Sequence, residues 1–205
     1  VFNLTKKNIC HLDDMKLIAK VKLVPTAEQR QLLKDTLYQA NQAANEVSGV
    51  AWEAKCFRAV AIHKLVYADV RQQYGLSAQM TVRVIGKVAG AYKAGRKRKR
   101  RFKQLGAIAY DSRILSWRMA EREISIWTIG GRQGMGYQGG ERQLELLESQ
   151  RGETDLAYIG GEFYLLATCE VEEPKEKEVE AYLGVDLGIV NLARRIATGM
   201  SMQAG

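Results

Sequence analysis

The pattern of apolar and polar positions begins with a strand. Residues 15–24 alternate apolar and basic side chains, which predicts a half-buried strand with a basic outer face. That face carries Lys16, Lys20 and Lys22. Pro25 ends the strand, and Thr26 with Gln29 has the spacing of a capping box, so a helix is expected next.

Three amphipathic segments follow the strand. The first carries apolar side chains from Leu33 to Val47 at steps of three and four, which places them in one stripe along a helix. Two more helices are predicted at about 58–73 and 78–94, and Ser77 is positioned to cap the last one.

After Gly95 the pattern changes to short β-type runs. These runs occupy residues 114–117, 123–129, 154–159 and 162–171. Gly160–Gly161 is typical of a two-residue hairpin turn. The glycine-rich stretch 130–140 lacks the GK[ST] ending of a phosphate loop, so we interpret it as a flexible hairpin end. Helices followed by many short strands predict an α+β fold with an antiparallel barrel or sandwich separate from the helices.

The charge of the chain favours nucleic acid as a partner. Lys and Arg number 31 against 23 Asp and Glu, a net charge of +8. A basic surface attracts polyanions, with nucleic acid first and anionic membrane second. No stretch approaches the roughly 18 apolar residues of a membrane span, so we expect no membrane partner. Three widely spaced cysteines favour a reduced, cytoplasmic protein.

The densest basic run spans residues 96–103. Its cations are Arg96, Lys97, Arg98, Lys99, Arg100, Arg101 and Lys103. Adjacent cations repel, and counterions or a phosphate backbone offset that repulsion best. Phe102, inside the run, is a candidate for stacking on a base. The alternatives are a solvated loop and a targeting patch.

A single carboxylate, Asp186, lies in the apolar segment 182–193, close to Gly184 and Gly188. An aspartate within a strand is costly unless it is paired or bound to metal. Two-metal phosphodiester hydrolases place an aspartate on a central strand to hold Mg²⁺. The alternative is a strand-end aspartate that caps a turn.

Six stretches together carry a family resemblance. They are KLVPTAEQ (22–29), NEVSGVAWE (45–53), AYDSRILSW (109–117), ERQLELL (141–147), DLAYIGGEFYLLATCEVEEP (155–174) and YLGVDLGIVNLA (182–193). In this order and spacing, residues 15–193 resemble the N-terminal part of the TnpB/OrfB proteins of insertion sequences. These are transposon-encoded, RNA-guided DNA endonucleases related to the miniature type V CRISPR effectors.

The resemblance implies a domain plan. A wedge-type β-barrel would comprise residues 15–25 and 105–173, interrupted by a helical recognition insert at 26–104 that includes the basic run. Residues 1–14 would be an extension or tail and residues 174–181 a linker. Residues 182–205 would begin an RNase H-like (RuvC) nuclease domain with its first strand.

The resemblance also implies a mechanism. Barrel and helices would bind a guide RNA, base pairing would select the target DNA, and three carboxylates would bind Mg²⁺ and cleave it. Asp186 matches the first carboxylate. The other two and the family's zinc ribbon are absent from this sequence, so we expect it to bind guide RNA and DNA without cleaving. The alternatives are a helix-turn-helix-like DNA-binding regulator without nuclease activity and a generic RNA-binding protein.

Overall fold

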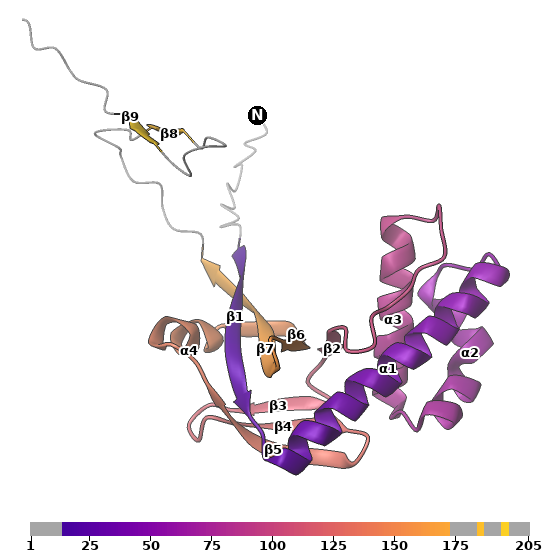
Figure 1. Ribbon diagram of the computed structural model, residues 1–205, viewed down its shortest axis with the longest axis horizontal. Helices are drawn as coiled ribbons and strands as arrows, with labels where there is room; N and C mark the ends of the chain where they lie inside the picture. Colours follow the sequence, from indigo (N-terminus) through magenta and orange to yellow (C-terminus); the bar gives the residue numbers. More distant parts are fainter. Residues whose placement is uncertain (1–13, 173–183, 187–193, 197–205) are drawn as a thin grey trace, which may run out of the picture. The chain divides into compact units, whose positions relative to one another are not determined.

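The computed structural model describes residues 14–172, together with the backbone of residues 184–186 and 194–196 (Figure 1). The chain divides into two compact units, residues 1–172 and 173–205. The described part of the first unit is α+β. Seven strands form a nearly closed antiparallel barrel, and four helices accompany it.

The barrel is built around the first strand of the chain. Its strands are β1 (Asp14–Val24), β2 (Ile108–Tyr110), β3 (Leu115–Arg118), β4 (Glu123–Thr128), β5 (Gly131–Gln138), β6 (Gln150–Ile159) and β7 (Glu162–Glu172). Their order is β2-β6-β7-β1-β5-β4-β3, so β1 lies at the centre and β2 and β3 form the two edges. The barrel is open between these two edges. The Tyr110 hydroxyl, on β2, donates to the carbonyl of Trp127, on β4, at 3.1 Å and so links the two sides of this opening.

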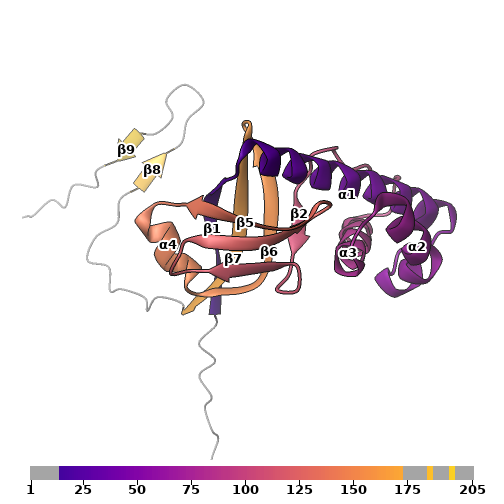
Figure 2. The same cartoon turned by 90° about the horizontal axis from the view of Figure 1, so that it is seen from below.

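Three helices are inserted between β1 and β2 and pack together as a bundle (Figures 1 and 2). They are α1 (Ala27–Glu53), α2 (Ala59–Tyr74) and α3 (Ala78–Ala94), while the short helix α4 (Glu141–Leu147) contacts β1 and β7. The predicted capping box is confirmed, because the Thr26 hydroxyl accepts from the Gln29 N–H while the Gln29 side chain accepts from the Thr26 N–H. Ser77 caps α3 as predicted, by accepting from the Met80 N–H.

One continuous core joins the bundle to the barrel. The stripe from Leu33 to Val47 that the sequence predicts on α1 is buried. Along β7, buried side chains alternate with half-buried ones, as expected for a strand with one face against a core. The hairpin turn at Gly160 and Gly161 has positive φ at both residues (59° and 88°), which glycine adopts without steric cost.

The prediction for residues 130–140 was wrong. Most of that stretch is β5, which pairs with both β1 and β4. Met135 and Tyr137 are buried at alternate positions, but the glycines around them carry no side chains and hide the alternation.

The two described segments of the second unit form a small sheet. β8 (Gly184–Asp186) pairs antiparallel with β9 (Arg194–Ile196). Three residues of the predicted apolar strand are therefore strand. Of the expected tail at 1–14, Asp14 already belongs to β1, and residues 1–13 lie outside the described part of the chain. The whole of the expected linker at 174–181 also lies outside it. The assignments to wedge and RuvC domains remain predictions.

Candidate nucleic-acid interface

The basic run follows α3 and returns along α1, where three polar side chains hold it. Asn41, Asn45 and Ser48 are spaced by four and three residues, so they lie on one face of α1. We call these three residues the polar ladder. Asn41 and Ser48 are fully buried, and buried polar groups on a helix need partners from elsewhere in the fold.

The polar ladder binds the backbone of residues 100–106. The Asn45 side chain makes two hydrogen bonds to the backbone of Phe102, as a neighbouring β-strand does. Its Nδ2 donates to the Phe102 carbonyl at 3.0 Å and its Oδ1 accepts from the Phe102 N–H at 2.8 Å. The Ser48 hydroxyl donates to the Arg100 carbonyl at 2.7 Å. Asn41 Nδ2 donates to the Gly106 carbonyl at 2.8 Å. These bonds fix the course of the segment along α1.

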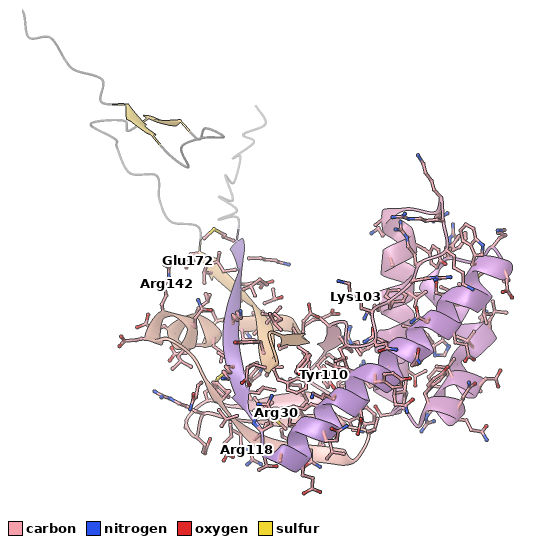
Figure 3. All side chains as sticks on the ribbon, viewed as in Figure 1. Arg30, Lys103, Tyr110, Arg118, Arg142 and Glu172 are labelled. Carbon is pink, nitrogen blue, oxygen red and sulfur yellow. The ribbon has the colours of Figure 1, made fainter. Side chains whose placement is uncertain are left out.

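Side chains of the held segment alternate between the bundle and solvent. Arg100 and Phe102 are half-buried, whereas Arg101 and Lys103 are exposed (Lys103 is labelled in Figure 3). The Arg100 guanidinium donates to the carbonyl of Gly95 at 3.1 and 2.7 Å and so caps the end of α3. The Phe102 ring packs against the core. Arg100 and Phe102 therefore anchor the segment, and its exposed cations are the groups available to a ligand.

The exposed cations of the basic run have no acidic partners among the described residues. Within residues 14–172, none of the ion pairs involves a residue of the basic run. The helical insert, residues 26–104, contains 16 Lys and Arg against 5 Asp and Glu, a net charge of +11. Because the whole chain is +8, the rest of it is −3. Positive charge is concentrated on the bundle, where it attracts polyanions.

The basic face of β1 differs from the run, because two of its three lysines pair with glutamates of β7. Lys16 pairs with Glu170 at 3.5 Å and Lys22 with Glu162 at 3.4 Å. The Lys20 ammonium lies 4.2 Å from the centre of the Tyr164 ring. Ion pairs that are partly exposed contribute about 0–1 kcal/mol to stability. The two glutamates of β7 offset the charges of Lys16 and Lys22 locally, whereas the cations of the basic run have no such partners within residues 14–172.

Lys87 extends the polar ladder and was not predicted from the sequence. Its ammonium, on α3, donates to Asn41 Oδ1 at 2.6 Å and to the Ala107 carbonyl at 2.8 Å. Burial lowers the pKa of Lys87 to about 8, and the carboxylate of Asp155 opposes that shift. The available signal was Asn41, a polar residue beside the apolar stripe of α1, but the sequence does not show which cation it meets.

Asp111 and Arg113 lie in one turn, but Asp111 makes its ion pair with a residue of the bundle and not with Arg113. The Asp111 carboxylate accepts from the Arg113 N–H at 3.0 Å within the turn. Its ion-pair partner is Arg83 of α3, at 3.0 Å, and Arg83 also pairs with Glu153. The pairs join the bundle to the barrel.

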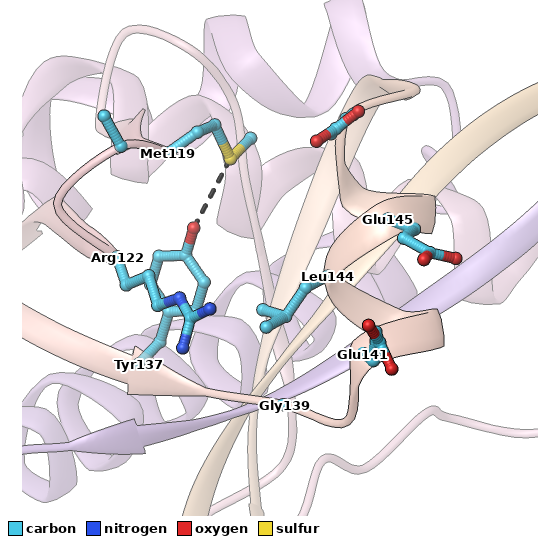
Figure 4. A pocket seen from close by; sticks show the side chains of 9 residues that line it. Met119, Arg122, Tyr137, Gly139, Glu141, Leu144 and Glu145 are labelled. Carbon is cyan, nitrogen blue, oxygen red and sulfur yellow. Dashed lines mark hydrogen bonds between the residues drawn. The ribbon is translucent and has the colours of Figure 1, made fainter.

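A cavity of about 640 Å³ lies on the barrel between β5 and α4 (Figure 4). The Tyr137 hydroxyl donates to Met119 Sδ at 3.4 Å, and Arg122 lines the same wall. The α4 side carries three glutamates: Glu141, Glu145 and Glu148. This acidic wall repels a phosphate backbone, and none of the predicted site residues lines the cavity.

Asp186, the predicted metal ligand, is the last residue of β8, and its backbone lies opposite that of Arg194 in the strand pairing with β9. Its side chain lies outside the described residues. Among those that are described, no group of three or more His, Cys, Asp and Glu is placed to hold a metal ion. In the same part of the chain, no helix has the length and apolar character needed to cross a membrane.

No protein-family model matches this chain, and no curated protein matches it either.

Proposed function

We propose that this chain binds RNA through the basic run on the helical bundle, as the N-terminal part of a TnpB/OrfB-like RNA-guided nuclease. The observation that carries the proposal is a basic segment held in place by the polar ladder, whose exposed cations pair with no acidic side chain within residues 14–172. Fixing the backbone of this segment before binding removes part of the entropic cost of ordering it on the ligand.

The exposed face of α3 favours RNA over duplex DNA as the partner. The α2–α3 pair has a three-residue turn with Gly75 in the left-handed conformation (φ 60°), which is the connection of a helix-turn-helix. A recognition helix, however, reads base edges with polar side chains. The corresponding stripe on α3 carries Val82, Gly86 and Gly90, which offer no donors or acceptors beyond the backbone.

Cleavage is not assigned to the described residues. On this proposal Asp186 would supply one carboxylate to Mg²⁺, with guide RNA and target DNA as the nucleic-acid partners. Binding is the activity that the geometry supports.

The experiment measures binding of the full chain to a structured RNA and to a duplex DNA over a range of salt concentrations. The triple variant Lys97→Gln, Arg101→Gln, Lys103→Gln is expected to weaken RNA binding and to lower the salt slope by about 2, at about 0.7 per lost phosphate contact. The matched control replaces three exposed barrel arginines: Arg118→Gln, Arg142→Gln and Arg151→Gln.

The control is expected to keep the salt slope of the parent. Equal losses in the two triple variants would overturn the assignment to the basic run, because general charge would then explain the binding. Tighter binding to duplex DNA than to RNA would instead support the helix-turn-helix alternative.

A further inference from the structure

The end of α1 has an unusual backbone. The Lys55 N–H donates to the Trp52 carbonyl at 3.3 Å and the Cys56 N–H to the Ala51 carbonyl at 2.9 Å, which is the Schellman pattern. Lys55 occupies the left-handed position of this motif, with φ of 52°, where glycine is usual. A lysine held in a disfavoured conformation points to a role for its side chain.

The Lys55 side chain covers an aromatic ring. Its ammonium lies 4.2 Å from the centre of the Trp52 ring, and the Arg96 guanidinium lies 5.3 Å from the centre of the Phe57 ring. Both rings are half-buried and both cations are exposed. Two adjacent aromatic faces are thus covered by charged groups rather than by apolar side chains.

The same two rings are supported from within the bundle. Tyr92 is fully buried and its ring is nearly parallel to that of Trp52, at 6.3 Å and 18°. The Phe57 ring lies 4.6 Å from that of Tyr92. The Tyr92 hydroxyl is bonded to Ser48 of the polar ladder, at 2.9 Å. The aromatic positions are therefore fixed by the same contacts that hold the basic segment.

We infer that Trp52, Lys55, Phe57 and Arg96 form a site for an unpaired RNA base. We call these four residues the aromatic–cation cluster. A base stacks on an aromatic ring through its π-face, and its flanking phosphates take up cations. Stacking on Trp52 or Phe57 displaces Lys55 or Arg96 from the ring and frees that cation for a phosphate.

The inference rests on the proposed function and makes it more specific. Bases inside a duplex are stacked on one another and present no free face, so the cluster selects single-stranded RNA. The neighbouring cations of the basic run, which begins at Arg96, continue the positive surface along the strand.

The first test uses the full chain with Trp117→Phe and Trp127→Phe, which leaves Trp52 as the only one of three tryptophans. Single-stranded oligouridine is expected to quench its fluorescence, and a blunt RNA duplex with the same number of phosphates is expected to leave it nearly unchanged. Equal quenching by both RNAs, or by neither while oligouridine binds, would overturn the inference.

The second test compares affinities. Trp52→Leu is expected to weaken oligouridine binding about fivefold or more and to leave duplex binding within about twofold, since stacking is lost and charge is kept. If Trp52→Leu fails to fold, Lys55→Gly replaces it, because glycine fits the left-handed position; it is expected to weaken oligouridine binding more than duplex binding. Equal losses for the two RNAs would count against the cluster.

The two proposals fail in different ways. Suppose that RNA binds and that the Lys97, Arg101, Lys103 triple variant binds it more weakly, while oligouridine does not quench the Trp52 fluorescence. The proposed function then stands and the aromatic–cation cluster is refuted. If the parent chain binds neither oligouridine nor duplex RNA, the proposed function is refuted and the inference with it.

Discussion

The polar ladder gives the sharpest test of how the basic segment is held. Asn45→Ala removes two hydrogen bonds to the backbone of Phe102, at 2.8 and 3.0 Å. Each such bond contributes about 0.5–1.5 kcal/mol, so their loss costs about 1–3 kcal/mol. Alanine returns roughly 0.6 kcal/mol of helix propensity. The free energy of unfolding is expected to fall by about 0.5–2.5 kcal/mol.

The effect on the segment is measured by amide hydrogen exchange. In the parent protein the Phe102 N–H donates to Asn45, so it is expected to exchange slowly; in Asn45→Ala it is expected to exchange much faster. The melting temperature is expected to fall by a few degrees, at about 2–4 °C per kcal/mol for a chain of this size. Gln39→Ala, on α1 but outside the polar ladder, is the control. Unchanged protection of the Phe102 amide in Asn45→Ala would refute the reasoning.

Three further predictions concern polar side chains that join one element of the fold to another. Lys87 has a pKa of about 8 in the fold and about 10.5 when unfolded, so between these values the unfolded chain holds more protons; stability relative to Lys87→Met should therefore rise from pH 8 to pH 10.5 in urea unfolding, and a flat difference would contradict the assignment. Burial and the hydrogen bond to Glu46 raise the pKa of Tyr74 from 10 to about 12. Because the unfolded chain loses the Tyr74 proton first, stability relative to Tyr74→Phe should fall from pH 10 to pH 12 in the same assay. A stability difference that does not change over this range would contradict the prediction. Arg83→Met removes the ion pair to Asp111 that joins the bundle to the barrel, at an expected cost of about 1.5–3 kcal/mol, measurable by calorimetry; an unchanged melting temperature would exclude that role.

Local patterns in the sequence were enough to predict the elements they define. The stripe ending at Val47 and the Thr26 cap fix α1, and Gly160–Gly161 fixes the hairpin of β6 and β7. β5 was missed because glycines interrupt the side-chain alternation around Met135 that marks a strand.

The charge of the interface was predictable, but its geometry was not. Seven cations in eight positions are visible in the sequence, yet nothing local shows that Arg100 turns inward as a cap while Arg101 faces solvent. That difference is set by Asn45 and Ser48, far earlier in the chain. Long-range side-chain to backbone bonds carry no periodicity, so pattern analysis does not detect them.

The place of β1 at the centre of the barrel has a consequence for synthesis of the chain. On the two sides of this strand, Lys22 is paired with Gln138 of β5 and Tyr164 of β7, which are made much later. At roughly 5–20 residues per second, β1 stays unpaired on both edges for several seconds after it emerges, while the helical bundle already has all of its residues. Unpaired edges invite association with other chains, and lysines along a strand oppose it. Neutralising Lys16 and Lys20 is therefore expected to appear first as aggregation of nascent chains, with little change in the stability of the finished fold.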